Sequence, residues 1–329
     1  MRIAFFSSKS YDKEYFKKYA RNYNHDIIFF ETALTEKTAN LTEGCEAVCV
    51  FVNDKVDKET IAILSKLGVK GILLRCAGYN NIDLEAAKEH HIKVLRVPAY
   101  SPEAVAEHSL ALIMTLNRKT HKAFNRVREN NFSIEHLVGF NLFEKTVGLI
   151  GTGLIGQAFA KIMLGLGCKV IAFDVYENES LKKLGINYLP LDEVFEQADI
   201  ISLHCPLTPE TKYIINKENI SKMKDGVMII NTSRGALINT KDVIGGLKSQ
   251  KIGYLGLDVY EQEEDIFFRD LSESVLKDET ISRLMSFPNV LITSHQGFFT
   301  KEALGQIATV TLNNATVLEN GEVLLNEVL

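Results

Sequence analysis

Short apolar runs alternate with amphipathic stretches along most of the chain. The apolar runs have the length of strands that are buried on both faces of a sheet. The stretches between them, such as 57–67 and 84–90, carry charges at helical spacing. This alternation predicts a parallel, doubly wound α/β sheet. The predicted strands are 3–6, 27–30, 47–52, 71–74 and 92–97, followed by a second series at 146–150, 169–173, 200–204, 227–230, 254–258 and 290–293.

A different pattern separates the two series. Ser101 suits an N-cap, Pro102 the first helical position, and Glu103 the first turn of a helix. Apolar residues then recur at helical spacing, without a breaker, to about Asn130. We predict a helix of up to 30 residues, which would bridge domains or pack against a second subunit. The alternative is one or two ordinary helices, and a final helical pattern covers 300–318.

Composition narrows the class of protein. A length of 329 residues suggests about two domains. The net charge of −5 argues against general nucleic-acid binding, which needs a basic face. Five cysteines without a C-x-x-C pair, and with no histidine near Cys45 and Cys49, predict reduced thiols, a cytoplasmic location and no metal site. No apolar run is long enough to predict a membrane span.

The sequence Gly151-Thr-Gly153-Leu-Ile-Gly156 follows a predicted strand and opens a helical pattern. In a dinucleotide-binding loop the first glycine forms the turn, the second admits the pyrophosphate and the third allows close packing. Asp174 ends the next predicted strand. An acid there accepts a hydrogen bond from the adenosine ribose and repels the 2′-phosphate of NADP, so we predict NAD. The alternative is a glycine-rich turn without a ligand.

Ionisable side chains follow three strands of the second series. Arg234 follows 227–230, His295 follows 290–293, and the strand 254–258 leads into Asp258 and the carboxylates Glu261, Glu263 and Glu264. Parallel strands present their carboxyl ends at one edge of a sheet, so we expect these groups near the phosphate loop.

This set of groups suits the reduction of a 2-oxo acid. A guanidinium binds a carboxylate and polarises the adjacent carbonyl, and a histidine donates the proton. A carboxylate beside that histidine orients it and favours its charged form. Position alone leaves Arg234 open as a cofactor phosphate clamp and does not separate the three glutamates. We expect His108 to serve helix packing, and His204 with Cys205-Pro206 to line the cofactor cleft.

The chain resembles the NAD-dependent D-2-hydroxyacid dehydrogenases, and within them the D-lactate branch. The resemblance covers essentially the whole chain. The long insert Asp265–Met285, with Phe267-Phe268, is similar to that branch rather than to the phosphoglycerate dehydrogenases. The motifs that carry the resemblance are Gly78-Tyr-Asn-Asn-Ile-Asp83, Pro98-Ala-Tyr-Ser-Pro102, Ala106-Glu-His108, Gly151-Thr-Gly-Leu-Ile-Gly156, His204-Cys-Pro206, Asn231-Thr-Ser-Arg-Gly235, Gly256-Leu-Asp-Val-Tyr-Glu261 and Ser294-His295.

The resemblance implies roles for individual residues. It makes Arg234 the binder of the substrate carboxylate, Glu263 the partner of the histidine and His295 the proton donor. It places backbone N–H groups near Ala77 and Gly78 on the carboxylate as well, and Tyr100 and Phe298 around the substrate side chain. For NAD it implies Gly151, Gly153, Leu154, Ile155, Gly156, Asp174, Cys205, Pro206, Thr211, Thr232, Ser233 and Asp258.

The resemblance also implies an architecture and a reaction. A Rossmann-like NAD domain, 99–298, would be inserted into a flavodoxin-like substrate domain, 1–98 plus 299–329. A homodimer, or a tetramer, would form through the NAD domains. The implied reaction is the reversible reduction of pyruvate to D-lactate. The alternatives are a dehydrogenase for larger 2-oxo acids, such as 2-oxoisocaproate or phenylpyruvate, and an NAD-sensing binding protein like the transcriptional corepressors that share this fold.

Overall fold

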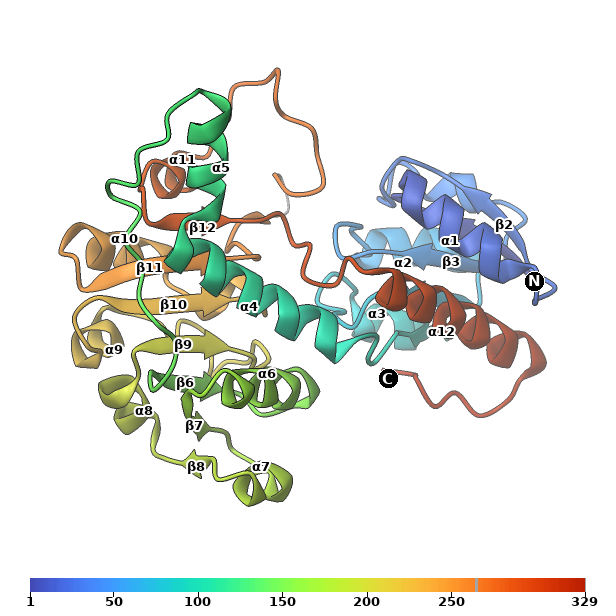
Figure 1. The fold of residues 1–329 in the computed structure, drawn as a ribbon. Helices are drawn as coiled ribbons and strands as arrows, with labels where there is room; N and C mark the ends of the chain where they lie inside the picture. Colours follow the sequence, from blue (N-terminus) through green and yellow to red (C-terminus); the bar gives the residue numbers. More distant parts are fainter. Residues whose placement is uncertain (264–265, 329) are drawn as a thin grey trace. The chain divides into compact units, whose positions relative to one another are not determined.

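The chain forms two compact units, and the computed structural model describes residues 1–263 and 266–328. The first unit comprises Met1–Ser101 and Phe298–Leu329, and the second comprises Pro102–Gly297 (Figure 1). The first boundary between the units, after Ser101, lies three residues later than expected from the sequence. The second, after Gly297, lies one residue earlier than expected. Within the described residues, no helix combines the length and apolar character that a membrane span requires.

The first unit is built on a five-stranded parallel sheet with the order β2-β1-β3-β4-β5. This is the flavodoxin-like order. Helices α1 (Ser10–Ala20) and α12 (Lys301–Asn320) lie side by side in this unit, so the second chain segment packs on the first (Figure 1). The remaining elements are β1 (Arg2–Phe5), β2 (Asp26–Phe29), η1 (Ala39–Thr42), β3 (Ala47–Val50), α2 (Lys58–Lys66), β4 (Gly71–Leu74), α3 (Leu84–Glu89) and β5 (Lys93–Leu95).

The second unit is built on a seven-stranded parallel sheet with the order β12-β11-β10-β9-β6-β7-β8. The strand order reverses between β6 and β9, and open α/β sheets bind ligands beyond the carboxyl ends of strands at such a switch point. Its strands are β6 (Thr146–Ile150), β7 (Lys169–Phe173), β8 (Asn187–Tyr188), β9 (Ile200–Leu203), β10 (Val227–Asn231), β11 (Ile252–Leu257) and β12 (Val290–Ile292). The prediction of doubly wound parallel sheets is confirmed.

Alternate residues of these strands enter two separate cores, because successive strand side chains point to opposite faces. Val147 and Leu149 pack with α4 (Pro102–Arg118) and α6 (Leu154–Gly165). Ile150 belongs to the opposite core. That core is covered by α8 (Leu191–Gln197), α9 (Lys217–Lys222), α10 (Thr240–Lys248) and α11 (Glu279–Met285), while α7 (Glu179–Lys183) adds to the first.

The long helix expected after Ser101 is divided into α4 and α5 (Thr120–Arg128). Lys119 between them adopts a left-handed conformation with φ of 51°. The Asn117 side chain accepts the N–H of Phe140 and donates to its carbonyl, both at 2.7 Å. These partners lie on a distant segment, so the interval 101–130 itself carries no breaker that would predict the division.

Candidate active site

The loop between β6 and α6 has the backbone of a dinucleotide-binding turn. Gly151 adopts φ of 95°, and a Cβ there would lie 2.5 Å from the N atom of Cys205. A Cβ on Gly156 would lie 2.2 Å from the carbonyl oxygen of Gly151. A Cβ on Gly153, at the N-cap of α6, would meet nothing within 4 Å. Two glycines therefore serve internal packing, and the third leaves the helix N-terminus open to a phosphate.

Asp174 is joined directly to this loop. Its Oδ2 accepts the N–H of Thr152 at 2.5 Å and the Thr152 hydroxyl at 2.9 Å. Its Oδ1 accepts the N–H of Tyr176 at 3.0 Å. A carboxylate has about four acceptor positions, so these bonds fix its orientation and leave capacity for ribose hydroxyls. The loop and Asp174 thus fit the phosphate and ribose groups of NAD.

The segments that follow β9 and β10 are bound to each other. The Ser233 hydroxyl donates to the Cys205 carbonyl at 2.7 Å, and the Thr211 hydroxyl donates to the Pro206 carbonyl at 2.7 Å. Thr232 shares a hydrogen bond of 2.8 Å with Ser109. Burial raises the pKa of the Cys205 thiol to about 11, so this side chain is a neutral, weakly polar surface at physiological pH.

His204 is excluded as a proton donor by its surroundings. Its Nε2 lies 2.9 Å from the Ser202 hydroxyl, and its ring packs on Phe159 at a centroid distance of 4.9 Å. Burial lowers the pKa of His204 to about 3. The imidazole therefore stays neutral throughout the physiological range.

His295 and Glu263 form a pair. Nδ1 of His295 lies 2.8 Å from Glu263 Oε1, and Glu263 Oε2 accepts the N–H of Tyr260 at 2.9 Å. Both side chains are mostly buried. Among the described residues nothing occupies Nε2 of His295. With Nδ1 held, that nitrogen is the one available for proton transfer.

The structure distinguishes Glu261 from Glu263, which sequence position alone did not separate as partners of His295. Glu261 accepts hydrogen bonds from the Tyr213 hydroxyl and, at 2.9 Å, from the Thr240 hydroxyl. It therefore anchors the start of α10, whereas Glu263 contacts His295. Glu264 lies outside the described residues.

Arg234 lies on a tight loop after β10. Asn231 fixes this loop by accepting the N–H of Ser233 at 3.0 Å and donating to the Arg234 carbonyl at 2.8 Å. A Cβ on Gly235 would lie 2.1 Å from the carbonyl carbon of Tyr260, so the loop packs directly on that segment. Nη1 of Arg234 donates to the Ser233 carbonyl at 2.7 Å. No carboxylate of the described residues forms an ion pair with this guanidinium, which leaves its charge available for an anion.

Asp258 is a buried carboxylate with four donors. It accepts the Thr293 hydroxyl at 2.6 Å, the N–H of Gln296 at 2.9 Å and the N–H of Gly297 at 2.7 Å. His108 Nε2 lies 3.1 Å from its Oδ1. Burial acts to raise the pKa of Asp258, but these hydrogen bonds, above all that of His108, hold it below the ordinary value. The carboxylate thus ties α4 to the segment that carries His295.

The sequence prediction for His108 missed this polar contact. Spacing placed His108 among packing residues, and only its position in the Ala106-Glu-His108 motif hinted at another purpose. Asp258 was expected at the cofactor, and in the structure its oxygens are occupied by protein donors. Neither residue could have been paired from the sequence, because α4 and β11 are far apart along the chain.

The other predicted substrate residues lie in the first unit. Ala77 and Gly78 follow β4, where Arg96 donates to the Ala77 carbonyl at 2.9 Å and the Cys76 thiol donates to the Gly78 carbonyl at 3.3 Å. Among the described residues, the N–H groups of Ala77 and Gly78 have no acceptor. Both N–H groups are therefore available to a ligand carboxylate.

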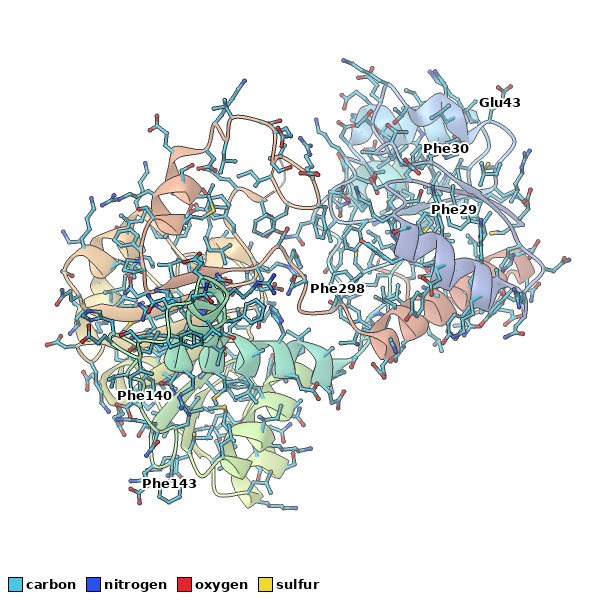
Figure 2. The ribbon with its side chains drawn as sticks, turned by 45° about the horizontal axis from the view of Figure 1, so that its top comes forward. Phe29, Phe30, Glu43, Phe140, Phe143 and Phe298 are labelled. Carbon is cyan, nitrogen blue, oxygen red and sulfur yellow. The ribbon has the colours of Figure 1, made fainter. Side chains whose placement is uncertain are left out.

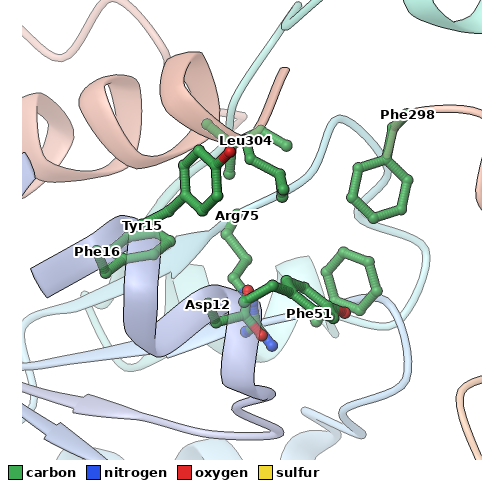
Figure 3. A pocket seen from close by; sticks show the side chains of 9 residues that line it. Asp12, Tyr15, Phe16, Phe51, Arg75, Phe298 and Leu304 are labelled. Carbon is green, nitrogen blue, oxygen red and sulfur yellow. The ribbon is translucent and has the colours of Figure 1, made fainter. Parts of the chain in front are cut away.

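Phe298 belongs to an aromatic cluster in the same unit. Its ring centroid lies 6.0 Å from that of Phe51 and 6.1 Å from that of Tyr100. Phe298 and Phe51 line a small cavity that also reaches Arg75 and has room for about one water molecule (Figure 3). The guanidinium of Arg75 packs on Phe51 at 4.9 Å and pairs with Asp12 at 3.4 Å. The aromatic cluster is therefore held from behind by a buried ion pair.

Comparison with known proteins identifies the family. Residues 110–297 match the family model described as D-isomer specific 2-hydroxyacid dehydrogenase, NAD binding domain. The chain is 51% identical to a D-lactate dehydrogenase of Escherichia coli, over 99% of both chains. Its fold is similar to the apo structure of the E. coli D-lactate dehydrogenase, with a TM-score of 0.93, 49% identity and complete coverage of both chains. It is also similar to a structure described as the pyruvate reductase of Chlamydomonas reinhardtii, with a TM-score of 0.95, 44% identity and coverage of 99% and 98%.

The chain belongs to the D-isomer specific 2-hydroxyacid dehydrogenases. The family prediction is therefore confirmed, and so is the prediction of NAD as the cofactor. The open backbone at Gly153 and the oriented carboxylate of Asp174 fit that cofactor in this dehydrogenase. Among the described residues, no group of three or more His, Cys, Asp or Glu side chains could hold a metal ion.

Proposed function

We propose that this dehydrogenase catalyses the reversible reduction of pyruvate to D-lactate with NADH, with His295 as the proton donor. The observation that carries the proposal is the 2.8 Å contact between His295 and Glu263, after strands of the sheet that bears the dinucleotide loop. NADH, when bound, supplies a hydride to the carbonyl carbon of the substrate. His295 gives the proton to the carbonyl oxygen, and the imidazole regains a proton from solvent.

Arg234 and the N–H groups of Ala77 and Gly78 are proposed to bind the substrate carboxylate. The guanidinium has no carboxylate partner among the described residues, and the two N–H groups have no acceptor. A guanidinium that binds the carboxylate also polarises the adjacent carbonyl, which favours hydride transfer. Glu263 holds the imidazole of His295 by Nδ1, so Nε2 remains for proton transfer to the substrate.

The nucleotide is proposed to bind along the loop Gly151, Gly153, Leu154, Ile155 and Gly156. Asp174 would accept the ribose hydroxyls, and the segments with Cys205-Pro206, Thr211 and Thr232-Ser233 would line the site. Asp258 contributes to this site by holding the segment 293–297. The hydrogen bonds that connect these segments support a rigid, preorganised surface.

Tyr100, Phe51 and Phe298 support pyruvate rather than a larger 2-oxo acid. The ring centroids of Tyr100 and Phe298 lie 6.1 Å apart, and the bulk of these rings supports a substrate side chain as small as the methyl group of pyruvate. Burial of one or two extra methylenes changes kcat/KM by roughly 10–200-fold, so some activity on larger substrates is expected.

One assay tests the proposal against its alternatives. We expect NADH oxidation with pyruvate to give D-lactate, with a higher kcat/KM than 2-oxoisocaproate or phenylpyruvate gives. A higher kcat/KM for either larger acid would assign the enzyme to that substrate. If NADH binds but none of these acids is reduced, the chain is an NAD-sensing binding protein.

We also propose a cytoplasmic homodimer formed through the second unit. Large apolar side chains are exposed on α5 and on the segment after it, and exposed apolar side chains of this kind support an interaction surface. Figure 2 shows Phe143 at the periphery of this unit. The exposed residues are Phe124, Val127, Phe132, Ile134, Val138 and Phe143. All five cysteines are buried thiols outside any disulfide, which supports a reducing compartment.

A further inference from the structure

Phe268 lies beside His295 and has no role in the chemistry described above. The two ring centroids are 5.9 Å apart, and the ring planes are inclined by 36°. Phe268 is half-buried and lies in the insert that leads from Glu263 to α11. The insert therefore contributes an aromatic ring beside the proton donor.

The backbone around Glu263 places Phe268 there. The Glu263 carbonyl accepts the N–H of Ile266 at 3.0 Å and of Phe267 at 2.8 Å. Phe267 is buried in the core of the second unit. Phe268 itself adopts φ of 63°, a conformation that is unfavourable for a residue with a side chain and persists only where its surroundings hold it. Glu263 thus holds His295 with its side chain and the start of the insert with its carbonyl.

Charged groups of the described residues contact His295 or lie on the loops that carry the site. Glu263 contacts Nδ1 directly. Asp258, paired with His108, accepts the N–H groups of residues 296 and 297, and the Asp258 carbonyl accepts the N–H of His295. Arg234 lies on the loop after β10, and Arg269 follows Phe268. Glu264 and Asp265 lie outside the described residues.

An aromatic ring at this distance acts on a histidine that must be charged. It attracts a cation within about 6 Å of its centroid, so it stabilises the imidazolium. The protonated form is the form needed for reduction.

We propose that Phe268 is a positioning residue that keeps His295 protonated and aligned for proton donation. This inference rests on the proposed function, because it assigns His295 the role of proton donor. Phe268 acts through the imidazole and is not assigned any contact with the substrate.

The test compares Phe268→Leu with Phe268→Tyr and with a control, Phe287→Leu. Phe287 is a half-buried phenylalanine of the same unit that packs on Arg283 and takes no part in the site. In Phe268→Leu we expect kcat for pyruvate reduction to fall roughly 2–5-fold, with KM within about twofold of wild type. The decline of reduction at alkaline pH should begin at lower pH. Phe268→Tyr keeps the ring and should restore the wild-type profile.

Titration of the His295 imidazole by NMR gives a readout that needs no turnover. We expect its midpoint to move to lower pH in Phe268→Leu and to stay unchanged in Phe287→Leu. An unchanged midpoint and pH profile in Phe268→Leu, or an equal change in Phe287→Leu, would overturn the inference. If the wild-type protein does not oxidise NADH with pyruvate, the proposed function fails instead, and the NMR titration still decides the effect of Phe268 on His295.

Discussion

At the scale of single residues, two carboxylates of the second unit, Glu263 and Asp258, have different roles. Glu263 divides its oxygens between His295 and a backbone N–H, so it acts on a group that must gain and lose a proton. Asp258 gives both oxygens to fixed donors. One carboxylate therefore supports a proton transfer, and the other supports the position of the chain around it.

Glu263→Gln should change the pH dependence of reduction. Glutamine keeps an acceptor for Tyr260 but loses the charge that stabilises protonated His295, so the alkaline decline of kcat/KM should move down by roughly one pH unit or more. The measurement is kcat/KM for pyruvate from pH 5 to 9. Glu261→Gln is the matched control, because Glu261 contacts Tyr213 and Thr240 instead of His295. An unaltered profile in Glu263→Gln would contradict the pairing.

Arg234→Lys should weaken substrate binding and leave the nucleotide bound. A single ammonium cannot reproduce two parallel hydrogen bonds, so KM for pyruvate should rise roughly 10–100-fold. Steady-state kinetics give KM, and fluorescence titration gives the Kd of NADH. If Kd rises and KM does not, Arg234 clamps the cofactor phosphates instead.

Asp258→Asn should destabilise the second unit by roughly 3 kcal/mol at pH 7, because an amide NH2 would replace one oxygen of a buried carboxylate whose two oxygens both accept hydrogen bonds. The pKa of Asp258 is depressed in the folded state, so its contribution is present above its ordinary value of 3.8 and is lost as the pH falls below that value. The difference between variant and wild type in urea unfolding should therefore shrink on acidification into that range. A constant difference would show that the charge of Asp258 is not what stabilises the fold.

At the scale of elements, the sequence predicted what depends on local pattern. The bounds of β4, β6 and β7 match the predicted ranges, because each is an apolar run with clear ends. The two-residue strand β8 was missed, since it is too short to carry a period. The division of α4 from α5 was missed because Asn117 finds its partner in Phe140.

The contacts of the candidate site also divide into those that the local sequence predicts and those that it does not. The glycine loop and Asp174 were predicted from spacing, since consecutive elements place them together. The contact of His295 with Glu263 rather than Glu261, and the contact of His108 with Asp258, depend on backbone turns and on packing between remote elements. Such contacts have no local sequence signal.

Gly156 and Gly153 of the nucleotide loop should respond differently to substitution by alanine. Gly156→Ala places a methyl group 2.2 Å from a backbone oxygen, so we expect a large fall in Tm. Gly153→Ala meets no protein atom within 4 Å, so Tm should stay near that of wild type while the Kd of NADH rises about tenfold or more. Thermal unfolding and fluorescence titration measure the two effects. Normal NADH binding by Gly153→Ala would refute the proposed place of the pyrophosphate.

At the scale of the whole molecule, the second unit is inserted into the first. The chain leaves the first unit after Ser101 and returns to it at Phe298. The proposed proton donor precedes that return by three residues. His295 and Arg234 therefore belong to the inserted unit, and Ala77 and Gly78 belong to the first.

The exposed apolar side chains of the second unit bear on the proposed dimer. Ile134 and Val138 are 80% and 81% exposed, so Ile134→Asp/Val138→Asp should fold normally yet dissociate a dimer into monomers. Sedimentation velocity measures the change. Val323→Asp is the control, because Val323 is equally exposed but lies in the first unit. A monomeric wild type, or dissociation by the control, would contradict the proposed interface.

The insertion also fixes the order in which the chain can be completed during synthesis. Helix α12, which packs on α1 and β4, is made after every strand of both sheets. All residues of the inserted unit are therefore synthesised while the first sheet still lacks one of its covering helices. Domains generally fold as units in the order of their synthesis. Here the unit that contains the N-terminal residues is completed last, because its helix α12 is made last. A nascent chain of this enzyme should thus acquire its nucleotide-binding unit before its N-terminal one.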